Sequence, residues 1–139
     1  MTDLEWMQKA IAKAEHGNTP FGAVLVNDKG DFYAACNTTS SDGPQAHAEL
    51  NVIQHMNQLS YHSPIELKLY TTVEPCPMCM SALIWAGIGH LIYGASISDA
   101  AQFGQQINIT SKALAKKAWY PIKITPSIKR KDCIQLFKS

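Results

Sequence analysis

Four side chains in two short segments of this 139-residue sequence could act together chemically. His47 and Glu49 are separated by one residue, and Cys76 and Cys79 are three apart. One imidazole and two thiolates are ligands that zinc prefers, and three protein ligands leave the fourth tetrahedral position to water, as in catalytic zinc sites. A carboxylate beside such a water can move its protons. We therefore expect Zn²⁺ to be bound by His47, Cys76 and Cys79, and Glu49 to be the catalytic acid and base.

The residues around the cysteine pair favour a helix N-terminus at that point. The positive end of a helix stabilises a thiolate, and side chains three residues apart on a first turn face the same way. Pro77, between the two cysteines, suits the first helical position because no hydrogen bond is lost there. The segment is therefore expected to direct both sulfur atoms to one point.

Other interpretations of these residues are open when each is taken alone. The Cys-x-x-Cys pair also fits a redox-active dithiol or half of a zinc knuckle. The histidine taken alone fits a surface residue, and the glutamate fits an acidic residue that stabilises the first turn of a helix. A structural zinc site would define a binding module, but it would need a fourth ligand, and Cys36, Cys133 and His55 have no motif spacing that offers one. A carboxylate beside an open position argues for an enzyme.

Composition indicates an ordinary globular protein. Hydrophobic residues make up 46% of the chain and charged residues 17%, and 139 residues suffice for one domain, which we expect to span residues 1–139. No apolar run is long enough to cross a bilayer, so no membrane partner is expected. The acidic N-terminus lacks the features of a signal peptide, which favours a cytoplasmic protein with reduced thiols.

Hydrophobic periodicity and turn residues predict an alternation of helices and strands. Helices are expected over residues 2–15, 46–59, 77–86 and 130–137, with one or two short ones within 98–120, and strands over 21–26, 32–36, 67–72, 90–94 and 122–125. A hairpin turn is expected at 27–30 and a loop at 37–45. The alternation predicts an α/β protein, a three-layer α/β/α sandwich with a central five-stranded mixed sheet.

The charge is unevenly distributed along the chain. The net charge is +1, but residues 111–139 hold eight of the 12 lysines and arginines and only one acidic residue. Such a skew fits either an RNA contact or a solvated basic face.

The motif residues resemble a known superfamily. His-x-Glu followed by Pro-Cys-x-x-Cys is a signature of zinc-dependent nucleobase deaminases. Residues 19–26, 72–79 and 124–133 resemble segments of the cytidine deaminase-like superfamily, in the branch that contains bacterial guanine deaminases and tRNA adenosine deaminases. The resemblance covers nearly the whole chain, and it implies the three-layer fold and a homodimer.

The same resemblance implies substrate-binding residues. Residues 84–86 and 98–101 look like the guanine deaminases, in which an aromatic side chain lines the base pocket and an aspartate contacts the purine and assists proton transfer. Trp85 and Asp99 are the matching residues. Asn37 resembles an asparagine that hydrogen-bonds the base, and Phe21 an aromatic residue near the metal-bound histidine.

The expected activity is hydrolytic deamination of a small purine base, with guanine converted to xanthine and ammonia. A shorter loop before the histidine motif and a short tail at 135–139 depart from the guanine deaminase pattern. The first alternative is deamination of adenosine in tRNA, which the basic C-terminal segment favours. A single arginine, and the lack of a lysine- and glycine-rich segment over 94–104, argue against tRNA. Deamination of cytosine or a nucleoside is the next alternative.

Overall fold

The structure, a computed structural model, describes residues 1–139 and is organised around one five-stranded sheet. Its strands are β1 (Gly22–Val26), β2 (Phe32–Cys36), β3 (Lys68–Val73), β4 (His90–Ala95) and β5 (Lys123–Thr125). Their order is β2-β1-β3-β4-β5, with β1 antiparallel to β2 and β3, and β3, β4 and β5 mutually parallel. The expected mixed sheet of five strands is confirmed.

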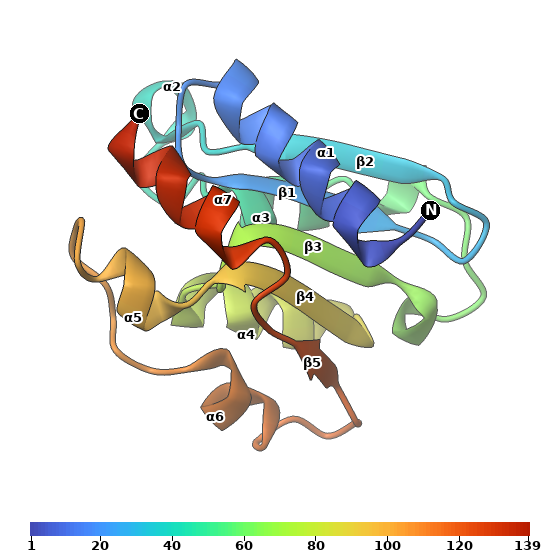
Figure 1. Cartoon of the computed structure of the whole chain (residues 1–139). Coiled ribbons are helices and arrows are strands. Elements are labelled where there is room, and N and C mark those ends of the chain that lie inside the picture. Colours follow the sequence, from blue (N-terminus) through green and yellow to red (C-terminus); the bar gives the residue numbers. More distant parts are fainter.

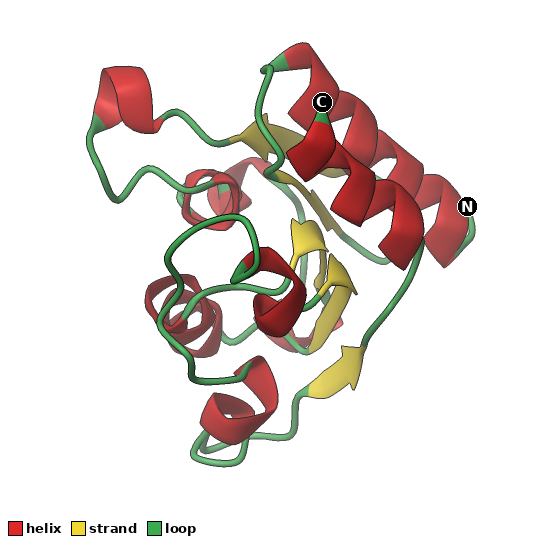
Figure 2. Cartoon of the chain, turned by 60° about the vertical axis from the view of Figure 1, so that its left-hand side comes forward, coloured by secondary structure: helices red, strands yellow, loops and turns green.

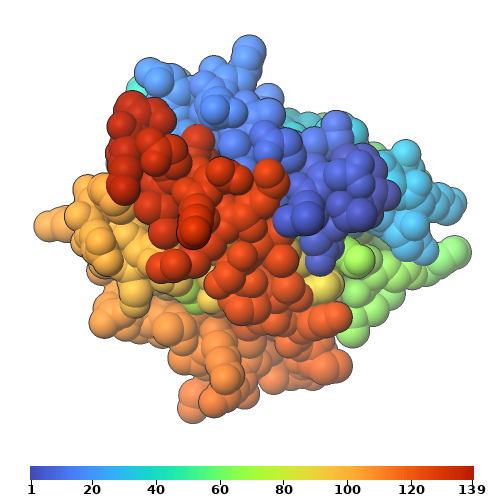
Figure 3. All heavy atoms as spheres, viewed as in Figure 1, coloured from blue at the N-terminus to red at the C-terminus, as the bar shows by residue number.

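Helices cover both faces of this sheet (Figures 1 and 2). They are α1 (Asp3–His16), α2 (Thr39–Asp42), α3 (Ala48–Ile53), α4 (Pro77–Ala86), α5 (Ile97–Ala100), α6 (Ser111–Ala115) and α7 (Arg130–Gln135), with 3-10 turns at Met56–Gln58, Pro64–Glu66 and Leu136–Lys138. The first and last helices, α1 and α7, share one face, where they lie side by side on the surface (Figure 3), and α3 and α4 cover the other. None of these helices is both long and apolar enough to cross a lipid bilayer.

The alternation of side chains along the strands produces a separate apolar core on each face. On β1, Ala23 and Leu25 join the core under α3 and α4, whereas Val24 and Val26 join the core under α1 and α7. All five residues of β1 are buried, because this strand lies between two others and has a helical layer on each side. The three-layer sandwich predicted from the sequence is confirmed.

The first helix packs closely on the sheet because of a glycine. A capping box of Thr2 and Glu5 fixes its start. At Gly22, where β1 begins, an added Cβ would lie 2.1 Å from the backbone oxygen of Ala10 in α1. The missing side chain therefore allows the helix backbone to approach the strand.

The helix expected over 46–59 is shorter than predicted. α3 ends at Ile53, and a separate 3-10 turn follows. The cause is local: Nδ1 of His55 lies 2.9 Å from the carbonyl oxygen of Asn51, while the His55 backbone N–H donates to Val52 instead. The carbonyl needed to continue the α-helical pattern is thus occupied by a side chain. Residues 37–45 also contain α2, and the other predicted elements lie within about two residues of their observed positions.

Candidate metal centre and active site

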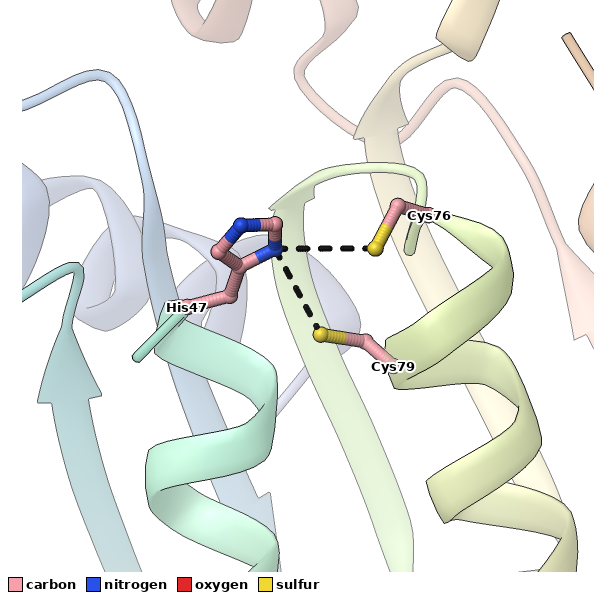
Figure 4. Close-up of side chains that lie close together, drawn as sticks. All are labelled: His47, Cys76 and Cys79. Carbon is pink, nitrogen blue, oxygen red and sulfur yellow. Dashed lines mark hydrogen bonds between the residues drawn. The ribbon is translucent and has the colours of Figure 1, made fainter. Parts of the chain in front are cut away.

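Two helix N-termini bring the three expected ligands together (Figure 4). His47 is the N-cap of α3, Cys76 is the N-cap of α4, and Cys79 lies in the first turn of α4. Pro77 occupies the first helical position of α4, as expected. Since α3 and α4 pack against each other on the same face of the sheet, their first turns place the imidazole opposite both sulfur atoms.

The spacing of the ligand atoms fits a tetrahedral zinc ion. Nδ1 of His47 lies 3.5 Å from Sγ of Cys76 and 3.7 Å from Sγ of Cys79, and all three ligand atoms lie within 4.8 Å of one another. Zn–N and Zn–S bonds of about 2.0 and 2.3 Å at tetrahedral angles separate nitrogen and sulfur by about 3.5 Å. No fourth histidine, cysteine or carboxylate joins this cluster. The three residues therefore fit Zn²⁺ with one coordination position left for water.

The two thiols are electrostatically unequal. Hydrogen bonding from Cys79, together with that from His47, lowers the pKa of Cys76 to about 4. The hydrogen bond with Cys76 and burial both raise the pKa of Cys79, and the hydrogen bond to Cys76 raises the pKa of His47. The centre therefore stabilises the thiolate form of Cys76, the more exposed of the two cysteines. The thiolate is the form of cysteine that binds metal.

Glu49 lies in the first turn of α3, two residues from His47, and is 4% exposed. Burial raises the pKa of its carboxyl group to about 7. A group with a pKa near neutrality can both accept and release a proton at physiological pH, as general acid–base catalysis requires. Its position beside the ligand cluster matches the role expected from the sequence.

A cavity of about 570 Å³ opens onto these residues. Its size is within the range of small-molecule binding sites. The lining consists of Phe21, Asn37, Thr39, Pro44, Gln45, His47, Glu49, Val73, Glu74, Cys76, Met78, Gln105, Gln106 and Ile107. The lining therefore contains no lysine or arginine.

Two of the substrate residues implied by the resemblance, Asn37 and Phe21, line this cavity. The Oδ1 atom of Asn37 accepts hydrogen bonds from the backbone N–H of Thr39 at 3.0 Å and from its hydroxyl at 2.9 Å. This pairing leaves the Nδ2 group of Asn37 available as a donor. Phe21 packs edge-on against Phe137, with ring centroids 5.6 Å apart, so the C-terminal turn supports that side of the cavity.

The other two, Trp85 and Asp99, lie outside the cavity lining, which differs from what the resemblance implies. Trp85 is on the solvent face of α4, 78% exposed, and its ring contacts Trp119 at 5.0 Å between centroids. The Asp99 carboxylate caps Ser96 and accepts two hydrogen bonds from Arg130 at 2.7 and 2.9 Å. Helical geometry directs the Trp85 side chain toward solvent, and the Asp99 carboxylate is occupied by its ion pair with Arg130. Their roles toward substrate stay predictions that substitution can test.

The residues that complete the cavity wall could not be predicted from the sequence. Gln105, Gln106 and Ile107 come from the loop between α5 and α6, which has no motif or periodicity. Gln45 and Met78 adjoin the motif residues in sequence but carry no chemical signal of their own. Only the tertiary structure places these side chains around a common cavity.

Fold and site together define a zinc-dependent hydrolytic deaminase that acts on nucleobases or nucleosides. Residues 1–95 match the cytidine and deoxycytidylate deaminase zinc-binding region, and the chain belongs to this family. It is 39% identical to the guanine deaminase of Bacillus subtilis over 126 residues, which cover 85% of this chain and 80% of that protein.

Two further similarities agree with this assignment. A crystal structure of guanine deaminase from Bacillus subtilis superimposes with a TM-score of 0.69 and 30% identity, over 88% of this chain and 84% of that one. The tRNA-specific adenosine deaminase of Buchnera aphidicola (subspecies Schizaphis graminum) is 30% identical over 99% of this chain and 92% of its own length.

Proposed function

We propose that this deaminase acts on free guanine and releases xanthine and ammonia. The observation that carries the proposal is a cavity without lysine or arginine, lined in part by carboxamides, that opens onto the ligand cluster and Glu49. Similarity to guanine deaminase over most of the chain supports the choice of base.

The lining of the cavity favours an uncharged substrate. Lysine and arginine are the side chains that bind phosphate groups in most proteins, and the lining contains neither. The side chains of Asn37, Gln45, Gln105 and Gln106 offer both donors and acceptors. The free Nδ2 group of Asn37 suits a carbonyl acceptor such as O6 of guanine. A free base therefore fits better than a nucleotide such as deoxycytidylate.

The reaction replaces the amino group on C2 of guanine with oxygen from water, so that guanine and water yield xanthine and ammonia. Zinc held by His47, Cys76 and Cys79 would polarise a water molecule and lower its pKa. Glu49 would accept one proton from the attacking water and pass it to the ring nitrogen. It would then take the second proton from the hydroxyl group formed on C2 and pass it to the amino group, which departs as ammonia while the C2 carbonyl forms. Burial of Glu49 keeps its pKa near 7, so one carboxyl group can perform both steps.

Deamination of adenosine in tRNA is the second candidate, and one observation favours it. Residues 111–139 carry eight lysines and arginines, of which only Lys129 and Arg130 form salt bridges. The remaining lysines are available to phosphates. The absence of basic side chains from the cavity itself places this candidate second.

We also propose that the chain forms a cytoplasmic homodimer that serves purine metabolism. Four free cysteines suit a reducing compartment. Met78, Trp85 and Trp119 are exposed by 38%, 78% and 65%. The first two are seven residues apart on α4 and so share one helix face. Exposed apolar side chains gathered in this way are typical of a protein interface.

An ammonia-release assay of the zinc-loaded protein tests the substrate. The substrates are guanine, guanosine, adenine, adenosine, cytosine and an anticodon stem-loop, and Glu49→Gln is the matched inactive control. We expect guanine to be preferred over the other free bases by about tenfold or more, since a site that hydrogen-bonds its substrate rejects analogues lacking those groups. Glu49→Gln should keep fold and zinc but lose turnover by about a hundredfold or more.

Each alternative predicts a different result. Activity confined to the stem-loop would transfer the assignment to tRNA. Full activity of Glu49→Gln would exclude the proton-transfer role, and a zinc-loaded protein without any deaminase activity would favour a structural zinc module.

A further inference from the structure

A buried carboxylate that the mechanism does not use lies next to the metal-binding turn. Glu74 follows β3, two residues before Cys76, and is 5% exposed. Its Oε1 accepts a hydrogen bond from the backbone N–H of Ile97 at 2.9 Å. Its Oε2 accepts from the backbone N–H of Ser111 at 2.8 Å and from the Ser111 hydroxyl at 2.6 Å. No lysine, arginine or histidine pairs with it, so these three donors compensate for burying the charge.

The two partners of Glu74 bracket a wall of the active-site cavity. Ile97 is the first residue of α5 and Ser111 the first residue of α6. Between these helices runs the α5–α6 loop, residues 101–110, which contributes three of the residues that line the cavity. One carboxylate therefore joins the metal-binding turn to the first residue of each of the two helices that flank the wall.

The α5–α6 loop has few other attachments. Gln106 is half-buried, and the other residues of 101–110 are exposed. The backbone hydrogen bonds of the loop connect it only to its own residues and to the adjoining helices. One aromatic contact, between Phe103 and Phe137 with centroids 5.0 Å apart, reaches another element. The position of the loop therefore depends strongly on how its ends are held.

We propose that Glu74 is a positioning residue for substrate binding, which clamps the α5–α6 loop so that Gln105 and Gln106 face the bound base. The proposal rests on the proposed function. A carboxylate suits the clamp because both of its oxygen atoms accept hydrogen bonds, one from each of the helices that flank the loop. An amide at this position directs an NH₂ group at one of the backbone donors and leaves that donor unpaired.

The test is Glu74→Gln in the zinc-loaded full chain, with Glu15→Gln as a control. Glu15 is exposed and its carboxylate accepts no hydrogen bond, so the control removes the same charge without a clamp. For Glu74→Gln we expect KM for guanine to rise about tenfold while kcat changes by less than about threefold, because small displacements of binding groups weaken substrate positioning. Zinc content should stay at the wild-type level. Amide hydrogen exchange over residues 101–110 and at Ile97 and Ser111 should accelerate.

A second variant, Ser111→Ala, removes only the hydroxyl donor. This variant should raise KM and accelerate hydrogen exchange, but by less than Glu74→Gln. Combining the two substitutions in one protein should add little to the effect of Glu74→Gln, because both act on the same interaction. If Glu74→Gln does not fold, Ser111→Ala is the test of the proposal. Unchanged KM and unchanged hydrogen exchange in Ser111→Ala would then overturn the clamp.

Other results separate the clamp from the proposed function. Loss of zinc, or a fall in kcat with unchanged KM and unchanged exchange, would show that Glu74 serves only the metal-binding turn. Hydrogen exchange requires no substrate. Faster exchange of the loop in a protein that deaminates no base would therefore support the clamp while refuting the proposed function.

Discussion

Replacing Asp99 with asparagine separates a structural role of this residue from a role in substrate binding. Its side chain joins α5 to α7 through two hydrogen bonds with Arg130, 31 residues away. It also caps α5 through Ser96. Asparagine keeps one oxygen for the cap but cannot form the two-point ion pair. We expect Asp99→Asn to lower stability and to leave kcat/KM for guanine within about threefold of wild type, because the side chain does not line the cavity.

The magnitude follows from the pKa of the carboxyl group. Hydrogen bonding from Arg130, together with the groups of Ser96, lowers the pKa of Asp99 from 3.8 to about 2. A shift of this size corresponds to about 2 kcal/mol of folding free energy. The Arg130 side chain is 50% exposed, so solvent screening reduces the contribution of the pair, and we expect a loss of about 1 kcal/mol at pH 7.

Urea unfolding of both proteins from pH 7 to pH 2 measures this contribution. Because folding lowers the pKa, the stabilisation by Asp99 is fully present above about pH 4 and is lost as the pH falls toward 2. The difference between wild type and Asp99→Asn should therefore shrink over that interval. A difference that does not depend on pH would refute the ion-pair argument. A loss of kcat/KM of a hundredfold with unchanged stability would show that Asp99 acts on the substrate, as the resemblance implies.

Three further predictions concern the metal, the packing of α1 and the exposed face of α4. Removing zinc with a chelator should lower the melting temperature, because zinc at 100 times its Kd stabilises the fold by about 2.7 kcal/mol; an unchanged melting curve would contradict a metal centre. Gly22→Ala should cost about 2 kcal/mol in urea unfolding, because its Cβ meets Ala10, whereas Gly104→Ala, with nothing within 4 Å, should be neutral. Trp85→Ser should convert a dimer to monomers in analytical ultracentrifugation, and a variant that sediments like wild type would exclude this face.

The chemistry of the metal centre is encoded locally in the sequence. The two cysteines share one helical turn, and Pro77 favours a helix start there, so the direction of both sulfur atoms follows from a five-residue segment. The histidine and the glutamate are likewise fixed within one segment at the start of α3. These residues could be predicted because each depends on neighbours in sequence and on helix geometry.

The strands and most helices were also predictable, since apolar periodicity reports which face of an element is buried. The expected helix over 46–59 was too long, because the spacing of apolar residues gives no sign that the His55 side chain occupies the backbone carbonyl of Asn51. The surroundings of Trp85 show the same limit: its spacing on α4 is clear from the sequence, but whether that face meets a cavity or solvent depends on other elements.

By itself, the sequence determined the ligand set, the alternation of helices and strands and the membership of the deaminase superfamily, and it predicted Glu49 as the proton carrier. Only the tertiary structure decided which loop forms the wall of the cavity, that Asp99 pairs with Arg130, and that Glu74 joins residues 23 and 37 positions away. The physical reason is the range of the interactions. Helix starts and motif spacing act over one turn of chain, whereas hydrogen bonds between distant segments depend on how the layers pack.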